Sequence, residues 1–121
     1  MEYRELGNTG LNVSAFCLGT MTFGEQTPAK AAHLQLGQAL DAGVNLVDTA
    51  EMFPSPSRAQ TYGLAEKILG DWLKRNGKRN SVFVATKAAG PGAFVPWIRG
   101  GDSVHDENNL NRAVDASLTR L

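Results

Sequence analysis

Short apolar runs alternate with helical patterns along this chain, and this alternation restricts the possible folds more than any other feature. Each run is short enough for one buried strand, and in order they cover residues 15–18, 46–47 and 81–87. Apolar residues recur at helical spacing over residues 28–43, 64–74 and 108–121. Strands that alternate with helices form a parallel sheet with right-handed crossovers. The sequence therefore predicts an α/β fold.

A β-hairpin is expected before the first of these strands. Residues 1–6 and 11–14 flank a Gly-Asn-Thr-Gly turn at residues 7–10, which supplies the backbone freedom of a tight turn. A hairpin followed by three βα units fits the N-terminal part of a (β/α)8 TIM barrel, and we expect residues 1–121 to form one such portion. Three strands cannot close a barrel. We therefore expect an incomplete barrel that is marginally stable, or self-associates through the exposed sheet edge, or is only part of the working protein.

The composition narrows the classes of function. The 121 residues are 42% hydrophobic and 20% charged, with a formal net charge of zero, as in ordinary globular domains. No basic tract suits nucleic acid or a membrane surface, no apolar run is long enough to span a membrane, and no signal-peptide pattern is present. Cys17 is a lone cysteine, which excludes an internal disulfide and, between Phe16 and Leu18, predicts a small core residue. We expect a cytoplasmic protein without nucleic-acid or membrane partners and without a metal site.

Two opposite charges follow the second and third predicted strands. Asp48 comes directly after Leu46 and Val47, and Lys87 ends the run at residues 81–87. The carboxyl ends of parallel strands meet at one edge of the sheet, where ligands bind and catalytic side chains lie. A helix-capping or turn role for Asp48, or a plain ion pair, is the alternative. We expect the two side chains to meet at this edge and to serve the site.

Two loops are candidates to line a ligand pocket. Residues 19–24 follow the first strand, and their two glycines flank threonine hydroxyls, so that a ligand could approach the backbone closely. The glycine spacing is neither the dinucleotide fingerprint nor a P-loop. Residues 88–106 form a long loop rich in glycine and proline. Phe23 in the first loop and Trp97 in the second are candidate substrate contacts, and Trp97 could equally anchor its loop on the domain.

Several motifs in order carry a resemblance to a known family. They are Gly7-Asn8-Thr9-Gly10-Leu11, Leu18-Gly19-Thr20-Met21-Thr22-Phe23-Gly24, Asp48-Thr49-Ala50 and Ala85-Thr86-Lys87. Together they resemble the aldo-keto reductase superfamily over essentially the whole chain. The segment from Asp48 to Met52, with the Pro/Ser-rich loop after it, is similar to the bacterial Tas-like branch.

The resemblance implies an NADPH-dependent oxidoreductase that reduces aldehydes or ketones to alcohols. In the family, hydride passes to the carbonyl carbon, a tyrosine donates the proton, a lysine lowers the pKa of that tyrosine, and an aspartate pairs with the lysine. Asp48 and Lys87 match the aspartate and the lysine. Gly19, Thr20, Met21 and Asp48 are the implied cofactor contacts.

The sequence departs from the family pattern in two ways. Phe53 stands in the tyrosine slot, and loss of a general acid costs on the order of 10²–10⁴ in rate. Tyr62 is a candidate substitute for the missing hydroxyl. In the family a histidine also orients the carbonyl, and it belongs to a fourth strand, after Leu121. We therefore expect weak or no activity from this chain alone, and a non-catalytic cofactor-binding or regulatory relative, or an inactive truncated product, is the alternative.

Overall fold

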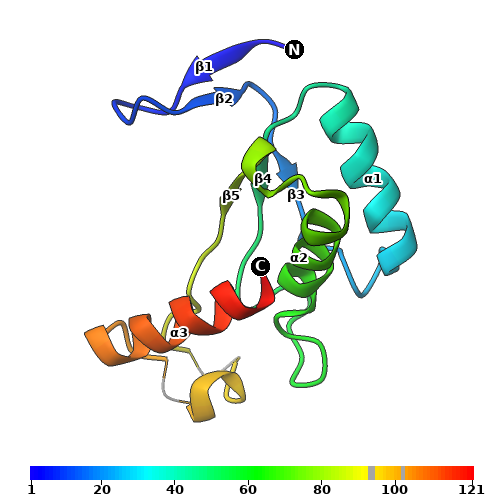
Figure 1. The fold of residues 1–121 in the computed structure, drawn as a ribbon. Helices are drawn as coiled ribbons and strands as arrows, with labels where there is room; N and C mark the ends of the chain where they lie inside the picture. The colour runs from blue at the N-terminus through cyan, green and yellow to red at the C-terminus, as the bar shows by residue number, and fades with distance from the viewer. Residues whose placement is uncertain (93–94, 102) are drawn as a thin grey trace.

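A computed structural model describes residues 1–92, 95–101 and 103–121. Figure 1 shows a small parallel sheet with two helices packed along one side, a hairpin at one end and a third helix at the other. The elements in order are β1 (Tyr3–Glu5), β2 (Asn12–Ser14), β3 (Leu18–Gly19), α1 (Ala29–Asp41), β4 (Leu46–Asp48), α2 (Leu64–Asn76), the 3₁₀ turn η1 (Arg79–Ser81), β5 (Phe83–Ala85), η2 (Ile98–Gly101) and α3 (Glu107–Arg120). The predicted α/β order of a hairpin followed by three βα units is confirmed.

The strands form two separate sheets. β1 and β2 pair antiparallel, with Arg4 opposite Val13, as the hairpin prediction requires. β3, β4 and β5 pair in parallel in that order, with Leu18, Val47 and Val84 in one row across the sheet. Among the described residues β5 has a strand partner on only one side, so the parallel sheet is open.

The hairpin covers the amino end of the parallel sheet. Asn45, directly before β4, accepts a hydrogen bond from the backbone N–H of Ser14 at 2.7 Å and donates its side-chain amide to the Asn12 carbonyl at 3.1 Å. Tyr3 also donates its hydroxyl to the Gly43 carbonyl at 2.8 Å. The opposite, carboxyl end of the sheet is therefore the end left for ligands.

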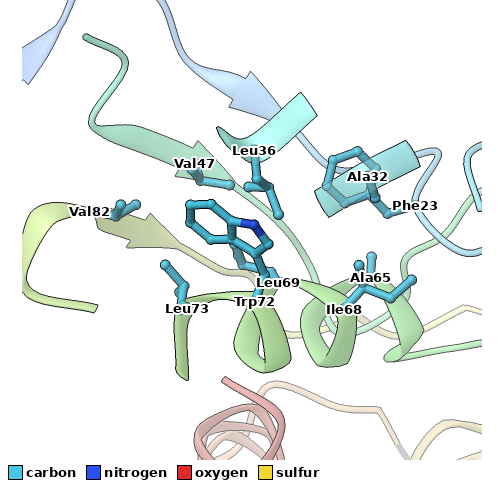
Figure 2. Close-up of a cluster of buried hydrophobic side chains, with 10 residues drawn as sticks. All are labelled: Phe23, Ala32, Leu36, Val47, Ala65, Ile68, Leu69, Trp72, Leu73 and Val82. Carbon is cyan, nitrogen blue, oxygen red and sulfur yellow. The ribbon is translucent and has the colours of Figure 1, made fainter. Parts of the chain in front are cut away.

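The main hydrophobic core lies between the parallel sheet and helices α1 and α2 (Figure 2). Side chains alternate along a strand, so Leu18, Val47 and Val84 all point toward these helices. Leu36 of α1 and Leu69 of α2 are fully buried against them. Full burial of each such side chain contributes about 1.5–3 kcal/mol. The other face of the sheet, which includes the row of Gly19, Asp48 and Ala85, points away from α1 and α2.

The first parallel strand differs from its prediction. β3 covers only Leu18–Gly19, and the residues before it form a bend in which Ser14 donates its hydroxyl to the Phe16 carbonyl at 2.6 Å. Phe16 is therefore 72% exposed. Cys17 is also exposed, so the prediction of a core cysteine is wrong. The physical reason is that the apolar run turns away from the helices instead of continuing along them.

No helix in the described part of the chain is long and apolar enough to cross a membrane.

Candidate functional site

Asp48 and Lys87 meet at the carboxyl end of the parallel sheet. Lys87 Nζ donates to Asp48 Oδ1 at 2.6 Å and to the Thr49 carbonyl at 2.5 Å. The side chains of Lys87 and Asp48 are 50% and 40% exposed, so the pair is open to solvent and to a ligand. The prediction that the two charges meet at this edge is confirmed, whereas their catalytic roles stay a prediction.

Backbone pairing continues past the ends of β4 and β5 and fixes these two residues. The Thr49 N–H donates to the Ala85 carbonyl at 2.8 Å, and the Glu51 N–H donates to the Lys87 carbonyl at 3.0 Å. The segments that carry the aspartate and the lysine are therefore held side by side by main-chain bonds.

Phe53 lies beside the lysine. Lys87 Nζ is 5.1 Å from the centroid of the Phe53 ring, within the range of a cation–π contact. Phe53 also packs on the main core, half-buried. The ring in the tyrosine slot is thus next to the expected lysine, but it has no hydroxyl to offer.

The loop after β3 supports the site from a third strand. Thr20 is fully buried, and both its N–H and its hydroxyl donate to the Asp48 carbonyl, at 2.9 and 3.0 Å. Its hydroxyl therefore positions the aspartate backbone. Gly19 and Met21 are exposed, and a Cβ added at Gly19 would find no atom within 4 Å. Of the three predicted cofactor contacts at the end of β3 and in the loop after it, Gly19 and Met21 are open to a ligand and Thr20 is not.

The two predicted substrate contacts have different surroundings from those expected. Phe23 is 1% exposed, in the core with Ala32 and Ile68, and so it presents no surface to a substrate. That prediction is wrong because the loop turns the ring inward under α1. Trp97 packs with Met52 against a small second cluster of buried residues in the loop after β5. These contacts are those of the alternative reading, in which Trp97 anchors its loop.

Tyr62 lines a surface depression to which Lys87 does not contribute. The depression is also lined by Glu51, Arg99 and residues of α3, among them Arg112. No hydrogen bond joins its hydroxyl to Lys87 in the part of the chain that the structure describes. The proposed substitution of Tyr62 for the missing hydroxyl thus finds no contact to support it.

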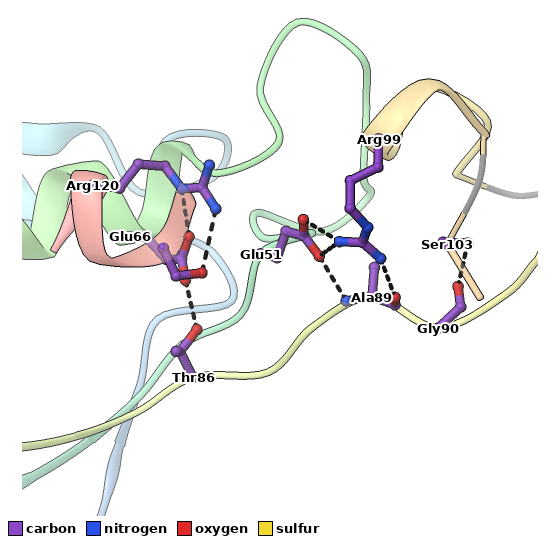
Figure 3. Close-up of polar contacts among 9 residues, drawn as sticks. Glu51, Glu66, Thr86, Ala89, Gly90, Arg99, Ser103 and Arg120 are labelled. Atoms are coloured by element: carbon purple, nitrogen blue, oxygen red, sulfur yellow. Dashed lines mark hydrogen bonds and ion pairs between the residues drawn. The ribbon is translucent and has the colours of Figure 1, made fainter. Parts of the chain in front are cut away.

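A buried ion pair between Glu51 and Arg99 was missed by the sequence analysis. Arg99 Nη1 bonds both carboxylate oxygens of Glu51, and Arg99 Nη2 donates to the Ala89 carbonyl at 2.7 Å (Figure 3). Glu51 Oε2 also accepts from the Ala89 N–H at 2.8 Å. The two side chains are 3% and 6% exposed. The pair therefore joins the segment after β4 to the loop after β5.

A second buried ion pair joins α2 to α3. Glu66 is fully buried, and its carboxylate accepts from Arg120 Nε at 2.6 Å and from the Thr86 hydroxyl at 2.5 Å (Figure 3). The pair lies on the helix side of the sheet, because Thr86 alternates with Lys87. In the described part of the chain no group of three side chains could hold a metal ion.

The charges of Asp48 and Lys87 affect the pKa of the Cys17 thiol. Partial desolvation of the otherwise exposed Cys17 thiol, and the negative charge of Asp48, raise its pKa above the ordinary value, while the Asp48 backbone and Lys87 act in the opposite direction. The thiol is thus near the Asp48–Lys87 pair, on the open side of the sheet. Its raised pKa disfavours the reactive thiolate.

Comparisons with known proteins agree with the motifs. The model of the Aldo/keto reductase family matches residues 15–121. Protein tas of Escherichia coli (strain K12) is 41% identical over 121 residues, which are 100% of this chain and 35% of that protein. The uncharacterized oxidoreductase YrpG of Bacillus subtilis (strain 168) is 45% identical over 127 residues, covering 100% of this chain and 36% of its own length.

Solved structures share the fold. The holo form of the aldo-keto reductase AKR11C1 from Bacillus halodurans superposes with a TM-score of 0.76 at 30% sequence identity, covering 100% of this chain and 36% of that one. The chain spans about a third of the length of the curated relatives it matches. The predicted fold class, part of a barrel that these strands leave open, is therefore confirmed.

Proposed function

Because this chain belongs to the aldo/keto reductase family, we propose that it supplies part of the active site of an NADPH-dependent oxidoreductase that reduces aldehydes or ketones to alcohols. Residues 1–121 are then the N-terminal portion of the reductase domain. The observation that carries the proposal is the 2.6 Å contact between Lys87 Nζ and Asp48 Oδ1 at the carboxyl ends of adjacent strands. In a (β/α)8 barrel this is the end at which active sites lie.

The residues present fit the nicotinamide end of such a cofactor. The space over Gly19 is open, and Met21 and the Asp48 carboxylate are accessible beside it. When bound, the cofactor supplies the hydride. Gly19 would leave room for it. Asp48 would offer its carboxylate as a hydrogen-bond acceptor, since Lys87 Nζ bonds only its Oδ1 oxygen.

The residues of this chain would control the transfer of the proton. A phenol titrates near ~10 and is a poor donor at neutral pH unless a nearby cation lowers its pKa. Lys87 supplies that cation, and Asp48 and the Thr49 carbonyl keep it in place. Phe53 lies within reach of the cation but has no proton to give, so we propose that the missing hydroxyl limits the rate.

The test is to restore the hydroxyl with Phe53→Tyr. The sample is the protein at the length at which its natural source makes it, assayed for NADPH oxidation with a panel of aldehydes. We expect turnover to rise by about 10²–10⁴, the usual contribution of a general acid. A Phe53→Tyr/Lys87→Met double variant is the matched control and should lose that gain. If neither the natural protein nor Phe53→Tyr oxidises NADPH with any aldehyde, the proposal is wrong.

Phe53 itself favours a second candidate, a non-catalytic relative that binds the cofactor. In that case the natural protein and Phe53→Tyr bind NADPH with similar affinity, and neither turns over. Fluorescence titration of NADPH beside the turnover assay distinguishes the two functions, since only the reductase gains rate with the hydroxyl.

A further inference from the structure

We propose that Glu51 and Arg99 are a positioning pair, whose task is to hold Lys87 in register with Asp48 and with the ring at position 53. This inference rests on the proposed function, because it assigns the pair to that site. Neither residue touches the lysine side chain. They act on it through the two backbone segments that carry the charged residues.

The contacts of Glu51 place it between those segments. It lies three residues after Asp48 and two before Phe53, and its backbone N–H donates to the Lys87 carbonyl at 3.0 Å. Its carboxylate accepts from the N–H of Ala89, two residues after Lys87, at 2.8 Å. One residue, Glu51, thus holds the backbone at the Lys87 carbonyl and again two residues later at the Ala89 N–H.

Arg99, in the loop after β5, adds further bonds to the same backbone segment. Its guanidinium bonds the Glu51 carboxylate and, at 2.7 Å, the Ala89 carbonyl (Figure 3). Both polar groups of the Ala89 backbone are therefore engaged by the pair. Ala89 and Ile98 are also buried in the cluster to which Met52, between Glu51 and Phe53, adds its side chain.

The energetics indicate a role beyond stability. Burying an ion pair is expensive, and an apolar pair of the same size is often as stable or more so. Arg99 also has φ of 48°, and it is the one non-glycine residue with a left-handed backbone in the part of the chain that the structure describes. The chain keeps both an expensive pair and an unfavourable backbone angle at the loop that borders Lys87. A role in positioning the site gives a physical reason for both.

The first experiment reads the lysine directly. Competitive acetylation of the protein, at the length at which its natural source makes it, with acetic anhydride, followed by peptide mass spectrometry, gives the labelling rate of Lys87 relative to Lys30, an exposed lysine on α1. Glu51→Gln and Arg99→Lys should each raise this ratio by about two- to fivefold, the range that a half-exposed ion pair contributes. Arg99→Lys keeps the charge but cannot bond the carboxylate and the Ala89 carbonyl in the same fork.

Arg120→Lys is the matched control. It weakens the other buried pair, which joins the helices, but keeps Glu66 and its hydrogen bond from the Thr86 hydroxyl next to Lys87. The Lys87 labelling ratio should stay at its natural value in this variant. An unchanged ratio in both Glu51→Gln and Arg99→Lys overturns the inference, and so does an equal rise in Arg120→Lys, since that would indicate general loosening.

A second readout links the pair to the chemistry. In Phe53→Tyr, the new phenol can be titrated by NMR with tyrosine labelled at the ring carbon that bears the hydroxyl. We expect its pKa below the ordinary tyrosine value, and we expect Glu51→Gln in the same background to return it toward that value. A pKa that Glu51→Gln leaves unchanged overturns the positioning role. An ordinary pKa in Phe53→Tyr itself overturns the proposed function, and the labelling ratio then still decides whether the pair positions Lys87.

Discussion

Lys87 has two oxygen acceptors and an aromatic ring around its ammonium group, yet half of the side chain remains exposed. Such a pair contributes little to folding, because water screens the charges and competes for the same donors. A buried pair behaves differently, since removing one partner leaves an uncompensated charge in the interior. The effect of a substitution on stability therefore distinguishes an exposed ion pair that serves a binding site from a buried ion pair that stabilises the fold.

Paired substitutions can measure this difference. We expect Asp48→Asn to lower the free energy of unfolding by less than about 1 kcal/mol, as for other exposed pairs. Glu66→Gln should cost about 3–5 kcal/mol, because Arg120 would keep its charge against a fully buried neutral partner. Urea denaturation followed by circular dichroism measures both. Equal losses in the two variants would contradict the assignment of Asp48 to an open site.

The Cys17 thiol gives a pH-dependent probe of the same site. Its pKa is raised by burial and by Asp48, so the reactive thiolate forms only at higher pH than in a free cysteine. We expect the rate of alkylation by iodoacetamide to rise at correspondingly higher pH. Asp48→Asn removes one of the two raising causes and should move the rate profile to lower pH. Asp71→Asn, on the outer side of α2, should leave it unchanged, and identical profiles in all three proteins would show that Cys17 does not sense Asp48.

The charged residues differ in how far the sequence predicts their partners. Asp48 and Lys87 could be paired because each follows a recognisable strand, and parallel strands bring their carboxyl ends together. Glu51 and Arg99 are 48 residues apart, and Arg99 lies in a loop without any periodic pattern. Glu66 lies on the helix face that also holds Leu69 and Leu73, so its position weakly indicated a buried acid. No local pattern indicated that Arg120 is its partner. Long-range partners of this kind depend on loop and helix placement, which residue patterns do not specify.

Helix α2 lies very close to the C-terminal end of α3 at Gly70. A Cβ built there would lie 2.0 Å from the Arg120 carbonyl oxygen and 2.8 Å from the Leu121 Cα, both backbone atoms that cannot move aside. Glycine inside a helix is ordinarily unfavourable by about 0.5–1 kcal/mol relative to alanine. Here it permits the helix contact that brings Arg120 to Glu66. The sequence shows a glycine in a helix, and only the structure gives its reason.

This contact predicts opposite effects for two glycine substitutions. Gly70→Ala should destabilise the protein by about 1–3 kcal/mol, as overpacking usually does, in spite of the better helix propensity. Gly37→Ala on α1 is the matched control, because no atom lies within 4 Å of the added Cβ. It should stabilise by about 0.5–1 kcal/mol. Thermal unfolding of the two variants checks the sign of each effect, and a stabilising Gly70→Ala would contradict the close approach of α3.

Over the whole molecule, one side of the parallel sheet is covered by α1 and α2, while β5 has an unpaired edge among the described residues. Beside that edge an apolar groove runs between Ala88 and α3, lined by Val114 and Leu118. Both side chains are more than half exposed. Open strand edges and apolar patches of this kind promote association between copies of a chain.

When residues 1–121 are produced by themselves, we expect the polypeptide to self-associate in solution through the surface formed by β5 and α3. Sedimentation velocity at increasing protein concentration should show species heavier than the 13.0 kDa monomer. Leu118→Glu places a charge in the groove and should return the protein to monomer, because burying that carboxylate in the contact would be costly. Leu34→Glu is the control, since Leu34 on α1 is 62% exposed against 69% for Leu118 but lies outside the groove. Association that persists in Leu118→Glu, or is lost equally in Leu34→Glu, would show that the contact lies elsewhere. A monomer at every concentration would show that the apolar groove is tolerated in water by a single chain.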